Sequence, residues 1–445
     1  MLENQKGHSG LEDVSLCSED ENTFQASLEN ININGDSSNG DNDDTLAESF
    51  PDEADPAVNI ATRERFYRMV YQSKPACIWN TDRELLHREH NITNRIEWRS
   101  GHNSEQSFIQ RYYGSALVVT QLTLTKTLNS CRVAHMNFNR DGNLICSVTG
   151  GNNIVVWDWA NNKKVHRFRP GHGNDILGAK FIESGGRLDI VSASEDGQVF
   201  RTIIPPSGGA ITAMRLYNHS NILTYPKPKI VLVPHSQSEI MSAGRDGWVK
   251  LFDTRLNSGA TAMLQCIGHD RRRIPLVTIA HHPLAPEFCV GGDDDRLRVF
   301  DKRKSTESVH EIVPGNFSNI ADITDVRYNH SGSEVLACFR FAGVYLFDSR
   351  NYKAGEYLNW FKGRYYSANF FGPRSEFIIT GDFDSIIFWE KKTEAIIGKQ
   401  IKKAGRILCL EAHPWYPVLA TAGENSPGIH FWFPNGFNLD DQNAN

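Results

Sequence analysis

Three short Asp-x-Arg sequences are the residues of this chain best suited to recognition chemistry. They read Asp253-Thr254-Arg255, Asp301-Lys302-Arg303 and Asp348-Ser349-Arg350. A guanidinium presents a planar set of donors that pairs with carboxylates and carbonyls while its stem packs, so Arg is well suited to anchor a protein interface. A structural alternative is that each Arg only pairs with the Asp two residues before it. The two interpretations are evenly matched for a single copy, and the repetition in consecutive copies favours an interface.

Two other clusters resemble cation sites. His281-His282-Pro283 holds adjacent imidazoles, but His413-Pro414 recurs at the equivalent place in a later segment, and this recurrence favours a scaffold role. The acidic run Asp293-Asp294-Asp295 falls in an expected turn, where Asp is common. The eight cysteines are scattered singly, without metal-ligand spacing, and are expected to be buried free thiols. We therefore expect no metal and no cofactor.

Motifs for catalysis are absent from the sequence. We find no G-x-S-x-G, no phosphate-binding loop, no H-E-x-x-H and no G-x-G-x-x-G between a strand and a helix. The sequence thus predicts no enzyme and no catalytic residue. No apolar run reaches the roughly 18 residues of a membrane span, and the first residues lack the pattern of a signal peptide. We expect a soluble protein of the nucleus and cytoplasm, with no membrane partner.

Charge is unevenly distributed along the chain. Residues 1–55 contain fifteen Asp or Glu and one Lys, so they carry −14, and the whole chain carries −6, which leaves +8 for residues 56–445. The acidic segment has few large apolar residues and is predicted to be disordered, either as an interaction arm or as a solubilising tail. The net basic remainder includes Arg271-Arg272-Arg273, but one short run does not predict a nucleic-acid site, which needs clustered charge with stacking aromatics.

The elements that must position these residues repeat along the chain. Seven segments end in a similar third-strand sequence, with the Trp or Phe of the motif at positions 157, 252, 300, 347, 389 and 432, and a Thr at position 202 in a degenerate copy. The spacing of about 40–50 residues is typical of the WD repeat, in which each copy forms one four-stranded blade. The sequence predicts an all-β, seven-bladed WD-repeat propeller. Equivalent positions in adjacent blades emerge on one face, so Arg255 and Arg303 should lie in neighbouring sectors.

Turn and capping residues support the repeat. Asp196-Gly197 and Asp246-Gly247 are hairpin dipeptides between the second and third strands. Gly171-His172 and Gly268-His269 precede two first strands, and these histidines are predicted to tie blades together through buried hydrogen bonds rather than to bind a ligand.

The ring needs a closing strand from the N-terminal side. After Trp432 the chain is short and polar, so the last blade lacks its outer strand. Leu122, Leu124 and Leu128 alternate with Thr and Lys residues as in a half-buried strand, and we assign this segment as the missing strand. Pairing of the first and last segments removes exposed edges.

Residues 56–116 are predicted to form a short helical arm. Thr81 and Glu84 have the spacing of a capping box, and Phe108, Ile109 and Tyr112 share one helical face. The helices either pack on their own propeller or enter a partner. The chain is thus divided into a disordered acidic tail (1–55), a helical arm (56–116), the propeller (117–436) and a polar C-terminal tail (437–445).

The repeat motifs resemble those of the WD-repeat substrate receptors of cullin-four RING ubiquitin ligases. The resemblance is to the group called DDB- and cullin-associated factor eight, and it covers about residues 108–434. It is carried by four stretches, FIQRYYGS (108–115), VVWDW (155–159), GPRSEFIITGDFDSIIFWEK (372–391) and HPWYPVLATAG (413–423).

This resemblance implies a non-catalytic receptor. Its propeller would bridge unknown protein substrates to the large damaged-DNA-binding adaptor subunit and, through it, to cullin-four. The family's adaptor boxes fall on Asp253, Arg255, Asp301 and Arg303, and the contribution of Arg350 stays open. Phe252 and Phe300 stand where the family's box usually has Trp.

Two alternatives belong to other classes. A peptide- or histone-binding propeller without a ligase would have an aromatic or acidic cage in its central channel. A nucleic-acid-binding protein would show steep salt dependence of binding.

Overall fold

A computed structural model describes most of the chain from residue 79 onward. The described ranges are 79–94, 104–128, 131–182, 187–206, 210–219, 228–256, 259–268, 271–315, 322–353, 355–401 and 405–436. The chain divides into two units, Met1–Ala61 and Thr62–Asn445, and every described residue lies in the second. The predictions for residues 1–55 and for the C-terminal tail from residue 437 lie outside the described residues.

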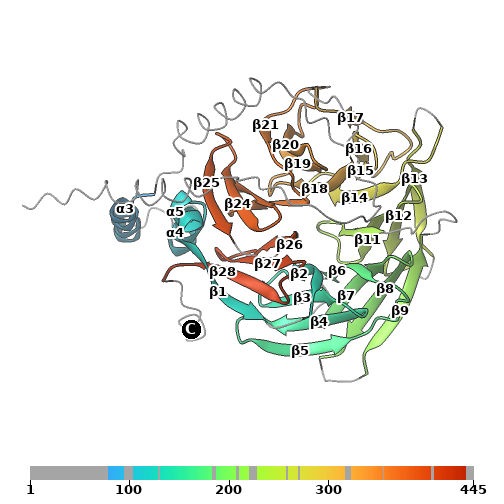
Figure 1. Ribbon diagram of the computed structural model, residues 1–445, viewed down its shortest axis with the longest axis horizontal. Coiled ribbons are helices and arrows are strands. Elements are labelled where there is room, and N and C mark those ends of the chain that lie inside the picture. Colours follow the sequence, from blue (N-terminus) through green and yellow to red (C-terminus); the bar gives the residue numbers. More distant parts are fainter. Residues whose placement is uncertain are drawn as a thin grey trace, which may run out of the picture. The chain divides into compact units, whose positions relative to one another are not determined.

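Seven four-stranded antiparallel sheets surround a central axis (Figure 1). Six of them consist of four strands in chain order, and the seventh has the order β1-β28-β27-β26. The first strands of neighbouring sheets contact one another, so these strands line the axis and the later strands lie outward. The all-β, seven-bladed architecture predicted from the sequence is therefore confirmed.

We number the sheets as blades 1 to 7 in chain order. Blade 1 contains β2 (Val133–Phe138), β3 (Leu144–Thr149), β4 (Asn153–Asp158) and β5 (Lys163–Phe168). Blade 2 contains β6 (Ile176–Ile182), β7 (Leu188–Ser194), β8 (Gln198–Ile204) and β9 (Thr212–Asn218). Blade 3 contains β10 (Lys229–Leu232), β11 (Glu239–Ala243), β12 (Trp248–Asp253) and β13 (Thr261–Gln265). Blade 4 contains β14 (Leu276–His281), β15 (Glu287–Gly292), β16 (Leu297–Asp301) and β17 (His310–Ile312).

The remaining blades follow the same plan. Blade 5 contains β18 (Ile323–Tyr328), β19 (Glu334–Phe339), β20 (Gly343–Asp348) and β21 (Asn359–Phe361). Blade 6 contains β22 (Ser367–Phe371), β23 (Phe377–Gly381), β24 (Ser385–Glu390) and β25 (Ile396–Ile401). Blade 7 contains β26 (Ile407–Ala412), β27 (Leu419–Gly423), β28 (Ile429–Pro434) and β1 (Leu122–Leu128).

The aromatic repeat positions all fall in third strands, and several hold their blade together. The indole of Trp157 on β4 donates to Ser147 at 3.1 Å, and the indole of Trp432 on β28 donates to Thr421 at 3.0 Å. In the degenerate blade 2, Thr202 takes the aromatic position, and the neighbouring Arg201 pairs with the fully buried Asp189 at 2.5 Å. A buried charge of this kind requires its partner, so the pair stabilises blade 2 only as a unit.

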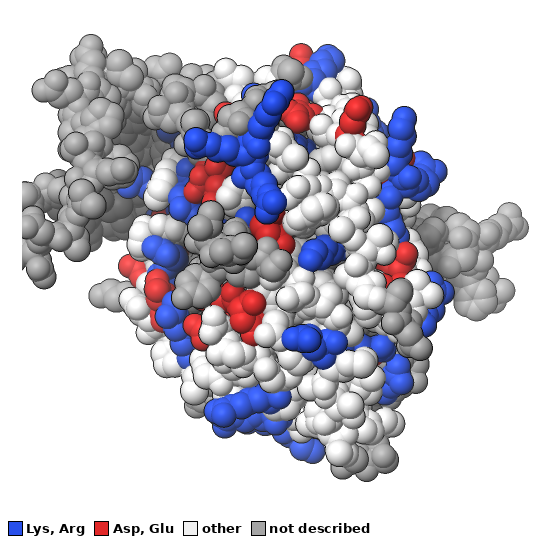
Figure 2. Space-filling view, turned by 90° about the vertical axis from the view of Figure 1, so that its right-hand side faces the viewer, with Lys and Arg blue, Asp and Glu red and all other residues white. Residues whose placement is uncertain are grey.

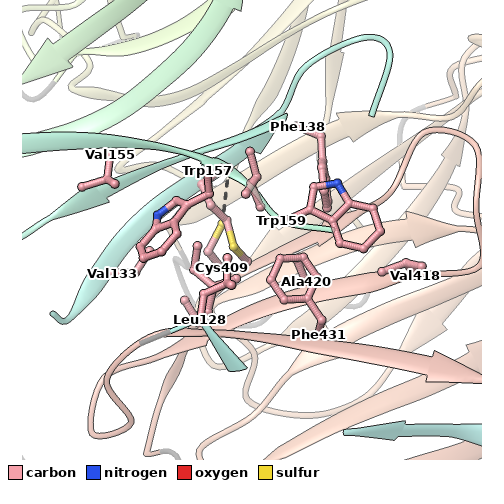
Figure 3. Close-up of a cluster of buried hydrophobic side chains, with 14 of the residues drawn as sticks. Leu128, Val133, Phe138, Val155, Trp157, Trp159, Cys409, Val418, Ala420 and Phe431 are labelled. Carbon is pink, nitrogen blue, oxygen red and sulfur yellow. Dashed lines mark hydrogen bonds between the residues drawn. The ribbon is translucent and has the colours of Figure 1, made fainter. Parts of the chain in front are cut away.

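The closing strand forms as predicted. β1 pairs antiparallel with β28, and Leu128 lies opposite Ile429. Leu128 packs into the seam between blades 7 and 1, with Val133, Trp157 and Phe431 (Figure 3). Leu122 and Leu128 are fully buried, whereas Leu124, which lies opposite Trp432 just before the register shifts between Leu124 and Lys126, is 40% exposed. The alternation expected from the sequence was therefore wrong at Leu124.

Three described helices precede the propeller: α3 (Thr81–Asn94), α4 (Ser104–Tyr113) and α5 (Ala116–Gln121). The end of α4 and all of α5 are anchored on blades 6 and 7, since Tyr113 contacts Phe371 and α5 buries Val118 and Val119. By contrast, α3 contacts α4, and its Leu85 and Leu86 are exposed. No described helix is long and apolar enough to cross a membrane.

Candidate functional site

Each of the first two Asp-x-Arg sequences forms a compact turn directly after a third strand. Asp253 accepts the backbone N–H of Arg255 at 2.9 Å and pairs with its guanidinium at 2.7 Å. Asp301 does the same with Arg303, at 2.8 Å and 3.0 Å. These hydrogen bonds lower the pKa of both carboxyl groups, so each Asp stays ionised and holds its guanidinium in a fixed orientation.

Both guanidinium groups remain available to a partner. The side chain of Arg255 is 73% exposed and that of Arg303 is 75% exposed. The structural alternative, pairing with the preceding Asp, therefore occurs in both copies, and it does not exclude an interface. A partner would meet an arginine whose rotamer is already restricted, which reduces the entropy lost on binding.

The third Asp-x-Arg sequence differs in one respect. Asp348 accepts the backbone N–H of Arg350 at 2.9 Å, as in the other copies. Within the described residues, the exposed guanidinium of Arg350 makes no ion pair. The turn is thus repeated in three adjacent blades, and the oriented guanidinium is repeated in two.

All three turns lie on one face of the ring. The middle residue of each donates its backbone N–H to the loop between the first and second strands of the same blade: Thr254 to Ser238, Lys302 to Pro286 and Ser349 to Ser333. Lys302 also reaches across to Glu239 of blade 3, at 2.7 Å. Arg255 and Arg303 therefore occupy neighbouring sectors, and we call the surface that carries these turns and loops the box face.

The histidines that resembled a metal site brace the loops of the box face. His282 Nδ1 accepts the backbone N–H groups of Leu284 and Ala285, at 3.0 Å and 2.7 Å. His413 Nδ1 accepts those of Trp415 and Tyr416, at 3.1 Å and 2.9 Å. The His-Pro sequences therefore recur because they form the same turn in two blades. The described residues contain no group of three or more metal-ligating side chains.

The acidic run in blade 4 binds arginines of the same chain. Asp294 lies 2.7 Å from Arg298, and Asp293 lies 3.2 Å from Arg245 of blade 3. This arrangement agrees with the turn interpretation rather than with a cation site.

The blade histidines within the described residues have structural roles. His172 is buried, lies 2.9 Å from the hydroxyl of Ser192 and 3.6 Å from Asp196. Sequence reasoning missed His219, which follows Asn218 instead of Gly and contacts both Asp246 and Ser242, at 3.0 Å and 2.7 Å. His219 could have been predicted from its position within the repeat, but not from a search for Gly-His pairs. The predicted His269 lies outside the described residues.

The central channel is lined by charged side chains of both signs. Arg327 on β18 of blade 5 lies 3.5 Å from Asp325 and 3.4 Å from Glu411 on β26 of blade 7. Because blade 6 stands between these two blades, the contact with Glu411 runs along the channel wall. Both carboxylates are thus held by one arginine. Among the described residues the channel does not present the free acidic cage that a histone-binding propeller would use for a lysine side chain.

Basic residues do not form a stripe on the side of the ring that Figure 2 shows. Lys and Arg are spread over this side and are interspersed with Asp and Glu (Figure 2). A nucleic-acid backbone is bound by a continuous basic track, so this side does not favour nucleic-acid binding.

The comparisons with known proteins agree on the fold. The β-propeller domain of Cps50 (Swd1) from Myceliophteria thermophila is similar with a TM-score of 0.58 at 17% identity, over 70% of this chain and 99% of that one. Raptor of Chaetomium thermophilum is similar with a TM-score of 0.60 at 17% identity, over 74% of this chain and 30% of that one. This chain is a seven-bladed WD-repeat propeller. No protein-family model matches it.

Curated relatives share part of this propeller. DDB1- and CUL4-associated factor 6 of Mus musculus is 28% identical over 270 residues, which are 55% of this chain and 30% of the relative. WD repeat protein iqw1 of Schizosaccharomyces pombe is 25% identical over 226 residues, which are 48% of this chain and 28% of the relative. The match thus spans less than a third of either relative. These relatives include a cullin-associated WD-repeat factor, and the particular group named from the sequence motifs stays a prediction.

Proposed function

We propose that this chain is a substrate receptor of a cullin-four RING ubiquitin ligase, of the factor-eight group that its motifs resemble. In this role the box face holds the ligase adaptor, and the protein recruits target proteins without forming a covalent intermediate. We place the protein in the nucleus and cytoplasm. The observation that carries the proposal is the repeated turn in which Asp253 and Asp301 orient the exposed guanidinium groups of Arg255 and Arg303.

The geometry supports a protein interface over a purely structural role. Two oriented cations in neighbouring blades offer a partner a fixed spacing, and such rigid arginines are frequent among the residues that dominate binding energy. The relatives whose names include DDB1 and CUL4 support the choice of partner. Phe252 and Phe300, where the family's box has Trp, are both buried at 8% and 5% exposure, so they affect the strand beneath each turn rather than the exposed arginine.

The test is recovery of adaptor and cullin with the double variant Arg255→Ala and Arg303→Ala. Loss of two interface anchors should weaken adaptor binding by on the order of a thousandfold, enough to abolish co-purification. The melting temperature should stay close to that of the parent, because both side chains are exposed.

A matched control is the double variant Arg132→Ala and Arg340→Ala. These arginines are also exposed and ion-paired, to Glu424 and Asp322, but they lie before β2 and between β19 and β20, at the ends of the blades away from the box face. Co-purification should survive in this control. Equal recovery of the adaptor by both double variants would refute the assignment and favour a peptide-binding propeller without a ligase.

A further inference from the structure

Two large apolar side chains are exposed on the box face. Leu284 is 69% exposed and Trp415 is 59% exposed, and no other large apolar side chain in the described part of the propeller is more exposed than these two. Leu284 lies in the loop between β14 and β15, and Trp415 lies in the loop between β26 and β27. Both loops join a first strand to a second strand, so both side chains lie on the same face of the ring as Arg255 and Arg303.

The same short turn presents both side chains. Its sequence is His-Pro-Leu-Ala-Pro at 282–286 and His-Pro-Trp-Tyr-Pro at 413–417. In each copy the histidine Nδ1 accepts the backbone N–H of the exposed residue, at 3.0 Å from Leu284 and 3.1 Å from Trp415. The turn is thus held by the histidine and the backbone, and a polar side chain at the third position would fit it equally well. The turn alone does not explain why this position is apolar in both blades.

Contacts to neighbouring blades fix both turns. The indole N–H of Trp415 donates to the carbonyl of Arg140 in blade 1, at 2.9 Å. The polar atom of this side chain is therefore satisfied, and what it exposes is an apolar ring in a fixed orientation. The carbonyl of Pro283, which directly precedes Leu284, accepts a hydrogen bond from His235 Nε2 of blade 3 at 3.0 Å.

The turn of Leu284 is also bonded to one of the Asp-x-Arg turns. The carbonyl of Pro286, two residues after Leu284, accepts the backbone N–H of Lys302 at 2.7 Å, and Lys302 directly precedes Arg303. The side chain of Lys302 continues to Glu239 in blade 3, at 2.7 Å. A partner that contacts the guanidinium of Arg303 would therefore meet the loop of Leu284 beside it.

Trp415 lies across the mouth of the channel from Leu284. The first strands line the axis, so the loops that directly follow them surround the mouth. Blade 4, which carries Leu284, and blade 7, which carries Trp415, are separated by two blades on one side of the ring and by three on the other. A partner that contacts both side chains has to span the mouth.

Scattered exposure of single apolar side chains is common and needs no explanation. In this protein two such side chains occupy one position of a repeated, rigid turn, on the face that also carries two oriented arginines. Trp and Arg are the residue types that most often dominate the binding energy of protein interfaces. Apolar anchors beside exposed cations thus fit a protein partner whose surface combines an apolar area with carboxylates.

We propose that Leu284 and Trp415 are apolar anchors of the adaptor contact, so that the adaptor lies across the mouth of the channel on the box face. This inference rests on the function proposed above and extends the contact from blades 3 and 4 to blade 7. Anchors that are already fixed lose little conformational entropy on binding. Substrates recruited at the same time must then use another surface, because the adaptor covers the opening of the channel on this face.

The test is titration of the immobilised full-length protein with purified adaptor. Trp415→Ser should weaken binding about thirtyfold, the usual effect of removing a dominant interface residue. Leu284→Ser should weaken it about tenfold, because less apolar surface is lost. Leu284→Met keeps an apolar side chain of similar volume and should bind as the parent does.

Salt separates these anchors from the arginines. The losses caused by Leu284→Ser and Trp415→Ser should be the same at low and high salt, because contacts between apolar groups are not screened. The double variant Arg255→Ala and Arg303→Ala should instead make the remaining binding less dependent on salt.

The matched control is the double variant Phe341→Ser and Phe383→Ser. These side chains are 54% and 51% exposed, but they lie in the loops between the second and third strands of blades 5 and 6, at the opposite end of the blades. The control should bind the adaptor as the parent does. Leu284→Ser should keep the melting temperature of the parent, because this side chain is exposed and makes no hydrogen bond.

The outcomes distinguish this inference from the proposed function. Full binding by Leu284→Ser and Trp415→Ser, together with loss of binding by the double arginine variant, would overturn the inference and leave the proposed function standing. No binding of the adaptor by the parent would overturn both. Unchanged binding by Trp415→Ser alone would overturn the extension across the channel. Light scattering that shows a dimer of the parent and a monomer of Trp415→Ser would also overturn the inference and assign the surface to a second copy of this chain.

Discussion

The closing strand offers the sharpest test of the fold, because its three leucines look equivalent in the sequence and differ in the structure. Leu128 is fully buried in the seam with Val133 and Trp157, whereas Leu124 is 40% exposed on the same strand. We expect Leu128→Ala to lower the free energy of unfolding by about 2–5 kcal/mol, the usual cost of a cavity in a core. Leu124→Ala should cost less than about 1 kcal/mol.

The two variants form a matched pair. Both make the same chemical change in β1, so differences in strand propensity and in the unfolded chain largely cancel. With an unfolding entropy of about 2.1 cal/mol/K per residue, the loss at Leu128 corresponds to a fall in melting temperature of roughly 3–7 °C for a propeller of this length. Leu122→Ala should resemble Leu128→Ala, because Leu122 is also fully buried, in the neighbouring cluster with Phe371 and Trp432.

Urea unfolding followed by tryptophan fluorescence measures these differences. The midpoint should move while the slope stays constant, which indicates a change in stability rather than in the denatured state. Equal losses at Leu124 and Leu128 would show that Leu124 is as buried in solution as Leu128. No loss at either position would show that β1 does not close the ring.

Three further outcomes follow from the packing. Gly332→Ala should destabilise the protein more than Gly151→Ala. Both glycines have positive φ (76° and 81°), but a Cβ would overlap the ring of His282 only at Gly332. Thermal melts of the two variants measure the difference. Burial lowers the pKa of His413 to about 4 from 6.5, so the unfolded chain binds a proton that the native chain does not, and stability should fall by roughly 3 kcal/mol between pH 6.5 and pH 4. His413→Asn should make that pH dependence shallower, and an unchanged profile would contradict the assignment. Deletion of residues 1–55 should leave the melting temperature nearly unchanged, whereas a large drop would show that this segment stabilises the propeller.

The blade pattern could be predicted from the sequence because it is a repeated local signal. The aromatic position, the Asp-Gly hairpin and the small-residue strand recur at a period that one blade requires, so even the degenerate copy at Thr202 falls in the third strand β8. The closing strand could also be predicted, because a propeller with an unpaired β28 would expose the edge of a sheet. Nothing in the alternation of leucines predicted the shift after Leu124, because a bulge depends on how two distant strands meet.

The start of α3 was also predicted only approximately from the sequence. The spacing of Thr81 and Glu84 predicted a capping box, but the side chain of Asn80 accepts the N–H of Arg83 at 2.9 Å, so the cap lies one residue earlier. Several polar residues near a helix start can each serve as the cap, and tertiary contacts select among them. Here Trp79 packs against Phe108 and Tyr112 of α4, which places Asn80 at the start of the helix.

In the candidate site, too, contacts between neighbouring residues could be predicted from the sequence, whereas contacts between distant strands could not. The Asp-x-Arg turns were visible in the sequence because both partners lie within three residues, and the structure shows the same two hydrogen-bonded contacts in the copies at Asp253 and Asp301. The charged cluster in the channel was not visible, because Arg327 and Glu411 are far apart in the chain and each is an ordinary strand residue. Closure of the ring brings them to one axis, where Arg327 contacts both Asp325 and Glu411. A buried charge is costly unless a partner of opposite charge lies beside it. The pairing of Arg327 with Glu411 therefore arises from the ring as a whole and from no single repeat.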